Sequence, residues 1–199
     1  MASIYELKTR FQDILRPLVR MLAKAGVTAN GVTLFALALS VATGLWLALA
    51  PESSAPYFAY PVLLFVRMAL NAIDGMLARE FDQKTRLGAF LNELGDVLSD
   101  AALYLALGFI SGAEIWLAAI FAIMAIATEV TSLIGTGIGV PRRNDGPMGK
   151  SDRAFVIGSF MLFGGIWPSL LEWTNSLLIL LAILCLVTIG NRIHRSLGE

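Results

Sequence analysis

The segment from Asn71 to Asp100 is rich in ionisable side chains, although the residues around them are apolar. It contains Asp74, Arg79, Glu93, Asp96 and Asp100. An ionisable side chain inside a membrane helix costs roughly 2.5 to 3.5 kcal/mol on insertion scales, so such residues indicate a functional site. Clustered carboxylates bind hard divalent cations, and a nearby Arg binds phosphate. Carboxylates in this setting are typical of a divalent-cation site, and also of an ion or proton pathway between helices.

Two antiparallel helices are needed to position these groups. At 100° per residue, one face of the first helix carries Asn71, Asp74, Gly75 and Ala78. The second helix has a polar stripe with a spacing of four residues, flanked by Glu93, and the stripe consists of Gly88, Asn92, Asp96 and Asp100. The charged segment 79–86 between the two helices predicts a short turn in water. The two polar faces are then expected to lie opposite each other.

This segment resembles the motif of the CDP-alcohol phosphotransferase family, also called CDP-alcohol phosphatidyltransferases. The motif is Asp, two residues, Asp-Gly, two residues, Ala-Arg, about eight residues, then Gly and two Asp at successive steps of four. The residues that match it in identity and spacing are Asp74, Gly75, Ala78, Arg79, Gly88 and Asp96. Asn71 and Asn92 stand where the family has its first and third Asp. This variant resembles a bacterial inner-membrane branch of the family.

The resemblance implies transfer of a phosphoryl-alcohol group, such as phosphatidyl, from a CDP-alcohol such as CDP-diacylglycerol to an acceptor alcohol. CMP is released, and the reaction serves phospholipid biosynthesis. Asp96 is the implied general base and also a metal ligand, together with Asp74, Asn71 and Asn92. The resemblance also implies a homodimer, and Mg²⁺ or Mn²⁺ as one or two ions. The CDP group is expected to contact Asp74, Gly75, Ala78, Arg79 and Gly88.

The two Asn residues leave several interpretations open. An Asn oxygen coordinates a metal but carries no charge, so two formal negative charges are lost relative to the family motif. Glu93 and Asp100 would restore some of this charge, or the site would bind only one metal ion. Alternatively, the site is degenerate and binds a CDP-lipid without turnover. An ion or proton carrier is a further alternative, since it also uses carboxylates between helices.

The composition predicts an integral membrane protein. Of the 199 residues, 57% are hydrophobic and 15% are charged, and the mean hydropathy is +0.73. A soluble domain is far less apolar. The formal net charge is zero, which gives no indication of a nucleic-acid partner.

The predicted fold is all-α, with six transmembrane helices and an N-terminal amphipathic interfacial helix. The six apolar runs have lengths close to that of a membrane span and cover residues 31–50, 57–78, 87–111, 113–138, 153–171 and 174–195. Three of the connections between them contain no Lys or Arg, namely residues 51–56, 111–114 and 171–175. Apart from Arg67, the 15 Lys and Arg residues lie in the termini and in the other loops. The positive-inside rule therefore places both termini and the motif turn in the cytoplasm.

The chain is divided into an N-terminal juxtamembrane segment, residues 1–26, and a membrane domain, residues 27–199. In the first segment apolar and basic residues alternate with helical periodicity, which predicts a helix at the lipid surface or packed on the protein itself. Pro17 is expected to kink or split this helix. Thr28 and Asn30 are candidate caps of the next helix, in a segment that resembles the family's Pro-Asn-x-Leu-Thr entry without the Pro.

A second group of charged residues lies later in the chain. Glu129 is a membrane acid that is expected to pair with Arg67 or with pocket groups, or to hold helices together. The loop 141–153 resembles a basic loop of the family that contacts phosphate of the donor or acceptor. Its candidate phosphate and acceptor ligands are Arg142, Arg143, Lys150 and Arg153, unless they only set the topology.

Overall fold

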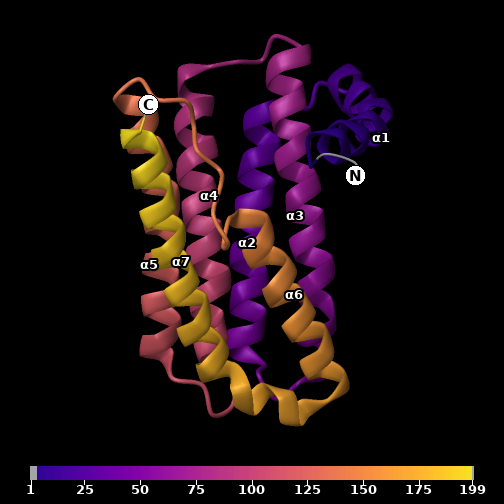
Figure 1. The fold of residues 1–199 in the computed structure, drawn as a ribbon. Coiled ribbons are helices and arrows are strands. Elements are labelled where there is room, and N and C mark those ends of the chain that lie inside the picture. Colours follow the sequence, from indigo (N-terminus) through magenta and orange to yellow (C-terminus); the bar gives the residue numbers. More distant parts are fainter. Residues whose placement is uncertain (1–3, 199) are drawn as a thin grey trace. The chain divides into compact units, whose positions relative to one another are not determined.

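The computed structural model describes residues 4–198, and within that range the protein consists of helices and their connections (Figure 1). This confirms the all-α class. In chain order the elements are α1 (Ile4–Lys24), α2 (Ala29–Leu49), α3 (Ser54–Glu80), α4 (Arg86–Ala106), η1 (Leu107–Phe109), α5 (Ile115–Gly137), α6 (Lys150–Ile166), η2 (Pro168–Trp173) and α7 (Thr174–Leu197).

The helices α2 to α7 follow the six predicted spans, but only four stretches of the described chain are long and apolar enough to cross a membrane. These are Ala29–Leu49, Ser54–Glu80, Ile115–Gly137 and Pro168–Leu197. The α4 helix carries the polar stripe, and α6 is only 17 residues long. The predicted count of six spanning helices is therefore not confirmed.

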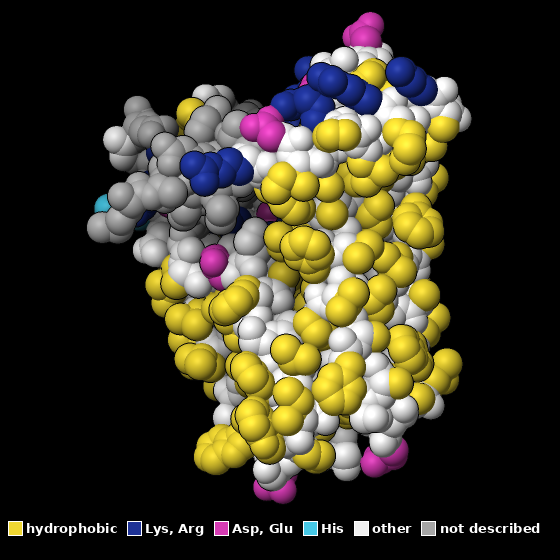
Figure 2. Space-filling model, turned by 90° about the vertical axis from the view of Figure 1, so that its right-hand side faces the viewer, with side chains coloured by type: hydrophobic (Ala, Val, Ile, Leu, Met, Phe, Trp, Pro, Cys, Tyr) yellow, Lys and Arg dark blue, Asp and Glu magenta, His cyan; other side chains and the backbone are white. Residues whose placement is uncertain are grey.

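Large hydrophobic side chains are exposed over much of the surface, as Figure 2 shows for one face. Examples are Leu49, which is 82% exposed, and Phe155, which is 75% exposed. Soluble monomers rarely expose extended apolar patches. A surface of this kind matches a protein whose solvent is partly lipid.

The chain forms two compact units. Unit 1 comprises residues 1–39 and 65–99, and unit 2 comprises residues 40–64 and 100–199. The helices α2, α3 and α4 each contribute residues to both units. Each unit has its own hydrophobic core.

In unit 1 the α1 helix packs on α3. Val19 is fully buried in a core that also contains Ile73, Met76 and Leu77. The helix continues through Pro17, so Pro17 does not split it, and the alternative that Pro17 kinks it stays a prediction. On the exposed side Ile14 is 75% accessible, which leaves apolar surface for a lipid or protein partner.

Two further contacts join α1 to α3. Arg16 donates hydrogen bonds from Nε and Nη2 to the carboxylate oxygens of Glu80, each at 3.1 Å, and it also pairs with Asp13. The Glu80 carboxylate holds the pKa of Arg16 above its ordinary value, mainly through hydrogen bonding. The rings of Phe11 and Phe65 meet edge to face with centroids 6.0 Å apart.

The start of α2 is fixed by Thr28, whose Oγ1 accepts the N–H of Gly31 at 3.1 Å. The sequence-based prediction of Thr28 as a cap is therefore confirmed. Asn30 has a different place, because it lies in the first turn of α2 and its amide donates to Thr85 Oγ1 at 3.5 Å.

In unit 2 the helices α5 and α7 lie side by side (Figure 1). The core of this unit is mostly aliphatic, with Tyr60 and Tyr104 fully buried among its members. Tyr60 donates its hydroxyl hydrogen to Leu103 O at 2.6 Å, so its polar atom is satisfied. The α6 helix ends at Ile166 because Pro168 follows and disfavours helical geometry at Trp167.

Candidate functional site

The polar residues of α3 and α4 in unit 1 form two crossed pairs. Asn71 on α3 donates its amide N–H to Asp96 Oδ1 on α4 at 2.8 Å. In the opposite direction, Asn92 on α4 donates to Asp74 Oδ2 on α3 at 3.4 Å. The predicted opposition of the two polar faces is therefore confirmed, and each carboxylate is held by an amide from the facing helix.

Arg67 adds a positive charge to one of these pairs. Its Nη2 lies 3.5 Å from Asp96 Oδ1 and donates a hydrogen bond to the Asp96 carbonyl oxygen at 3.2 Å. The Arg67 side chain is only 6% exposed, whereas that of Asp96 is 28% exposed. The structure thus pairs Arg67 with Asp96.

The other carboxylate is oriented by α2. Thr33 donates its hydroxyl hydrogen to Asp74 Oδ2 at 2.8 Å, and Asp74 itself is only 3% exposed. Thr33 lies one helical turn after Ala29, the first residue of α2. Its hydrogen bond to Asp74 shows that its side chain faces α3. Three helices therefore meet at Asp74.

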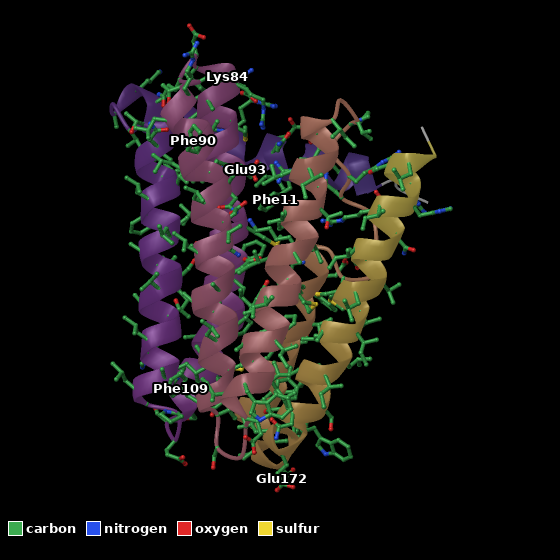
Figure 3. The ribbon with its side chains drawn as sticks, turned by 90° about the vertical axis from the view of Figure 1, so that its left-hand side faces the viewer. Phe11, Lys84, Phe90, Glu93, Phe109 and Glu172 are labelled. Carbon is green, nitrogen blue, oxygen red and sulfur yellow. The ribbon has the colours of Figure 1, made fainter. Side chains whose placement is uncertain are left out.

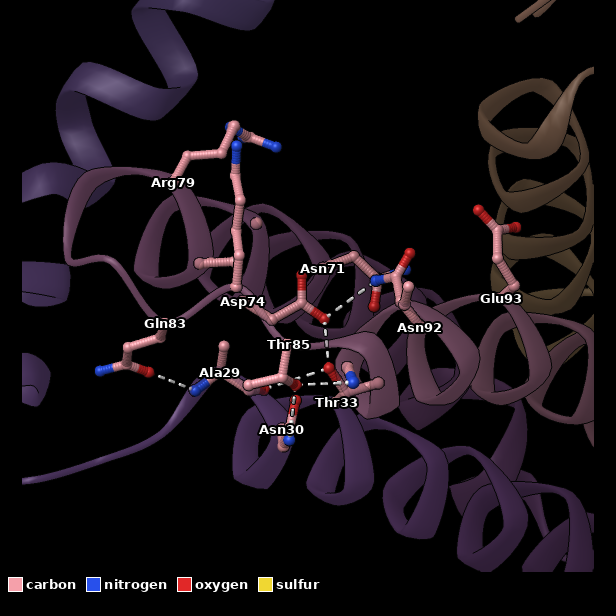
Figure 4. Close-up of a pocket in the computed structure, with 15 residues that line it drawn as sticks. Ala29, Asn30, Thr33, Asn71, Asp74, Arg79, Gln83, Thr85, Asn92 and Glu93 are labelled. Atoms are coloured by element: carbon pink, nitrogen blue, oxygen red, sulfur yellow. Dashed lines mark hydrogen bonds between the residues drawn. The ribbon is translucent and has the colours of Figure 1, made fainter. Parts of the chain in front are cut away.

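A cavity of about 510 Å³ opens beside these pairs. Figure 4 shows Arg79 above Asp74, and Glu93 on the far side of Asn92 from Asp74. In Figure 3, Lys84 lies in the turn after α3, and Phe90 and Glu93 follow on α4. The residues that line the cavity are Ala29, Asn30, Thr33, Asn71, Asp74, Gly75, Ala78, Arg79, Gln83, Lys84, Thr85, Gly88, Ala89, Asn92 and Glu93.

Two glycines are required by close approaches around this cavity. A Cβ added at Gly75 would lie 3.0 Å from Nη1 of Arg79, so the missing side chain makes room for the guanidinium. A Cβ added at Gly88 would lie 2.6 Å from Asn30 Oδ1 and 2.9 Å from Thr85 Oγ1. Gly88 thus allows α4 to approach the start of α2 closely.

The turn between α3 and α4 is tied to the start of α2 by Gln83. Its Oε1 accepts the backbone N–H of Ala29 at 2.7 Å, and its Nε2 donates to Val27 O at 3.3 Å. Ala29 lies in the first turn of α2, where a backbone N–H has no partner within the helix. Gln83 thereby fixes one wall of the cavity.

Unit 2 contains a separate buried charge cluster around Arg153, which is 0% exposed. Its Nη2 contacts both Asp100 Oδ2 and Glu129 Oε1 at 3.1 Å. A guanidinium has five N–H donors, and the other three reach Tyr104 Oη at 3.3 Å, Thr128 Oγ1 at 2.9 Å and Met148 O at 3.0 Å. All the donors of Arg153 are therefore engaged by the protein.

The other basic residues of this unit are less enclosed. Arg142 Nη2 lies 4.0 Å from Glu129 Oε2 with a side chain that is 39% exposed. Arg143 donates to Arg195 O at 3.4 Å, and Lys150 begins α6. Arg142, Arg143 and Lys150 are thus less buried than Arg153.

The site offers oxygen ligands of the kind that Mg²⁺ and Mn²⁺ prefer. Among the residues that the structure describes, no group of three or more His, Cys, Asp and Glu side chains is placed to hold a metal ion. The amide oxygens of Asn71 and Asn92 are needed to complete a ligand set with Asp74 and Asp96. The donor set therefore fits a divalent cation only if amides take part.

The comparison with known families agrees with this geometry. Residues 26–190 match the family described as CDP-alcohol phosphatidyltransferase. The chain belongs to this family of transferases. A relative of the chain is the inner membrane protein YnbA of Escherichia coli, which is 47% identical over 190 residues, or 96% of this chain and 94% of that protein.

A second relative of this phosphatidyltransferase-family chain is the phosphatidylinositol phosphate synthase of Mycobacteroides abscessus. It is 28% identical over 194 residues, which cover 92% of this chain and 84% of that protein. The family assignment extends the resemblance from the short motif to most of the chain.

Solved structures with the same fold include the phosphatidylinositol phosphate synthase PgsA1 of Mycobacterium tuberculosis. Its structure with CDP-DAG bound has a TM-score of 0.76 and 23% identity, covering 92% of this chain and 94% of that one. Its complex with manganese and citrate has a TM-score of 0.74 and 24% identity, covering 90% of this chain and 87% of that one. At this identity the likeness establishes the fold.

Most of the sequence-predicted site residues come together in unit 1. The five residues predicted to bind CDP all line the cavity, and they are Asp74, Gly75, Ala78, Arg79 and Gly88. Of the predicted metal ligands, Asn71, Asn92 and Glu93 also line it, and Asp96 is bonded to Asn71. Asp100 belongs to unit 2, where it pairs with Arg153.

The polar residues of the cavity lining that had no predicted role in the site are Asn30, Thr33, Gln83, Lys84 and Thr85. Asn30 and Thr33 belong to the segment that resembles the Pro-Asn-x-Leu-Thr entry of the family, and this was the available signal. Gln83 and Thr85 lie in a charged turn that carried no signal beyond its polarity.

Proposed function

We propose that the protein transfers a phosphatidyl group from CDP-diacylglycerol, or a related phosphoryl-alcohol group from another CDP-alcohol, to an acceptor alcohol. The observation that carries the proposal is the cavity of unit 1. It brings Asp74, Gly75, Ala78 and Arg79 together with Gly88 in a family whose members are CDP-alcohol phosphatidyltransferases. The PgsA1 structure with CDP-DAG bound supports a CDP-lipid as donor.

In this proposal each polar group has a defined task. The Arg79 guanidinium binds the pyrophosphate of the donor by charge-assisted hydrogen bonds. Asp96 accepts the proton of the acceptor hydroxyl. The acceptor oxygen forms a new bond to the phosphorus of the phosphatidyl group, and the bond from that phosphorus to CMP breaks. CMP leaves with the electron pair, and the proton passes from Asp96 to solvent.

A divalent metal ion, Mg²⁺ or Mn²⁺, would neutralise the phosphate oxygens when bound. Asp74 would hold it through a carboxylate oxygen, with Asn71 and Asn92 as amide ligands and Glu93 at the edge of the cavity, while Asp96 keeps its task as proton acceptor. The manganese complex of PgsA1 supports metal dependence in this fold. Thr33 keeps the Asp74 carboxylate in place through its hydroxyl.

For the acceptor, the candidates remain Arg142, Arg143, Lys150 and Arg153 of unit 2. The three that are less buried than Arg153 are the better ligands of an acceptor phosphate, because Arg153 already uses all its donors. We assign Arg153 the task of positioning the segment that carries the other three. Asp100 then serves this cluster instead of a metal.

The proposed location is a bacterial inner membrane, with six helices spanning it and the N-terminal amphipathic helix at its cytoplasmic surface. The name of the Escherichia coli relative and the apolar helices support it. The distribution of Lys and Arg supports cytoplasmic termini and a cytoplasmic active site. Assembly as a homodimer is part of the same proposal.

The test is release of CMP by the purified protein in detergent or vesicles, with Mg²⁺ or Mn²⁺, CDP-diacylglycerol and a panel of alcohols and alcohol phosphates. We expect release with at least one acceptor, and loss of about 10²-fold or more in the Asp96→Ala variant. Asp82→Asn is the matched control, since Asp82 is exposed in the turn after α3 and outside the cavity lining, and it should retain full release.

Other outcomes favour the alternative functions. Bound CDP-diacylglycerol without CMP release for any acceptor would replace the proposal with a protein that binds a CDP-lipid without turnover. Proton or ion flux into vesicles that depends on Asp100, again without CMP release, would favour a carrier.

A further inference from the structure

The Asp96 side of the site already contains a positive charge. The Asp96 carboxylate oxygen Oδ1 accepts an N–H of Asn71 at 2.8 Å and lies 3.5 Å from Nη2 of Arg67. Arg67 is 5% exposed, so its charge is poorly screened by water and strongly affects nearby groups. A divalent cation bound to Asp96 Oδ1 would compete with the Asn71 hydrogen bond and lie close to a buried guanidinium.

The Asp74 side differs in its ligands. The hydrogen bonds that Asp74 Oδ2 accepts from Thr33 and Asn92, at 2.8 and 3.4 Å, come from neutral groups. Asp74 lines the cavity, whereas Asp96 is not among the described residues that line it. A carboxylate at the wall of a cavity, oriented by side-chain donors, presents its oxygens to a cation that enters there.

The two amides complete this arrangement without adding charge. Each uses its N–H to hold the carboxylate of the facing helix, and each still has an Oδ1 atom as a possible ligand. The formal charges of Asp74, Asp96 and the buried Arg67, which pairs with Asp96, sum to one negative unit. Two divalent cations would leave a large uncompensated positive charge in a partly buried site.

From these contacts we infer that the site holds one divalent cation per chain, with Asp74 and not Asp96 as its carboxylate ligand, because the neutral Asn71 and Asn92 and the charged Arg67 leave too little negative charge for a second cation. This inference rests on the proposed function, because it concerns the cation of the same site. It makes the two Asn residues determinants of metal number, so that the substitution Asn→Asp should create a second cation site.

The experiment counts Mn²⁺ ions bound to the purified full chain, by electron paramagnetic resonance of free Mn²⁺ during titration. We expect one Mn²⁺ per chain in the natural sequence and two in the N71D/N92D variant. Asp74→Asn should weaken Mn²⁺ binding about ten-fold or more. The matched control is N144D/N191D, which adds the same two charges at exposed positions and should still bind one ion in the cavity.

Two ions in the natural sequence would overturn the inference, and so would none. An unchanged count of one in a folded N71D/N92D variant would also overturn it. If that variant does not elute as a monodisperse species, the count in the natural sequence and in Asp74→Asn decides. One ion without CMP release contradicts only the proposed function, whereas two ions with CMP release contradict only this inference.

Discussion

The two units of the protein differ in whether their charged side chains in apolar surroundings are fully bonded to protein groups or open to a cavity. Both units contain carboxylates and an Arg. In unit 2 all five N–H donors of the Arg153 guanidinium form hydrogen bonds to protein groups, and Arg153 is 0% exposed. In unit 1 the carboxylates of Asp74 and Asp96 are held by amides beside a cavity of about 510 Å³. A saturated, closed cluster stabilises helices, while an open cluster is available to a ligand.

This difference separates charged residues that are alike in the sequence. Asp96 and Asp100 are one helical turn apart on α4, and both continue the same polar stripe. Asp100 belongs to the closed cluster and is 3% exposed, whereas the Asp96 side chain is 28% exposed. A charge in a membrane helix therefore indicates either a site or a buried ion pair, and the partners decide between the two.

The largest effect that we expect is loss of stability when the closed cluster is broken. Arg153→Met should destabilise the protein by about 3 to 5 kcal/mol, because Asp100 and Glu129 are left as buried, uncompensated charges. Thermal unfolding in detergent measures the effect. Arg195→Met is the control, since the Arg195 side chain is 59% exposed, and its midpoint should change little. Equal midpoints for the two variants would contradict the comparison.

The Arg of the open cluster should show the reverse behaviour. Arg79→Met is expected to leave the unfolding midpoint nearly unchanged, because Arg79 is exposed beside the cavity. It should weaken CDP binding by about 1.5 to 3 kcal/mol, the range for a hydrogen bond to a charged group. Isothermal titration with CDP in the presence of Mn²⁺ measures this, with Arg86→Met in the same turn as control. Unchanged CDP affinity would contradict the assignment of the cavity.

Part of the candidate site could be predicted from the sequence alone. The spacing of Asp74, Arg79 and Gly88 predicted residues that the structure brings to one cavity, because helical periodicity fixes which side chains share a face. The apolar runs and the cap Thr28 indicated where the helices lie, but the predicted run 153–171 passed through Pro168, and α6 already ends at Ile166.

What the sequence could not supply was the choice of partners between distant segments. The pairing of Glu129 with Arg153, and of Arg67 with Asp96, depends on how helices pack and has no local signature. Gln83 is a similar case, since its contacts with the backbone at Val27 and Ala29 join segments 54 to 56 residues apart. The direction of each Asn–Asp hydrogen bond likewise needed the structure.

A smaller effect is expected from the residue that orients Asp74. Thr33→Val removes the hydroxyl that donates to Asp74 while keeping the shape of the side chain, and it should lower stability by about 1 kcal/mol. Mn²⁺ affinity should fall as well, since the carboxylate loses its fixed orientation. Titration with Mn²⁺ measures the affinity of the Thr33→Val variant. The control is Thr136→Val, which removes a hydroxyl that donates to Ser132 O in unit 2. Equal Mn²⁺ affinities would show that Thr33 does not orient Asp74.

The smallest effect concerns α1. Arg16→Gln breaks an ion pair with Glu80 in which both side chains are about one third exposed, at 33% and 35%. Exposed ion pairs contribute little to stability, so the unfolding midpoint should fall only slightly. Proteolysis of α1 is the more sensitive measurement, and Arg20→Gln, on the exposed side of the helix, is the control. A loss of stability as large as that of Arg153→Met would contradict this and show that the Arg16–Glu80 pair stabilises more of the protein than α1.

The central claim is that the open cluster of unit 1 is a cation and cytidine diphosphate site. A structure of the protein with Mn²⁺ and CDP-diacylglycerol, with anomalous scattering recorded for manganese, tests it most directly. The account predicts a manganese peak at coordination distance, about 2.0 to 2.5 Å, from Asp74, with the pyrophosphate next to Arg79. A manganese peak away from Asp74, or a nucleotide bound outside this cavity, would contradict it.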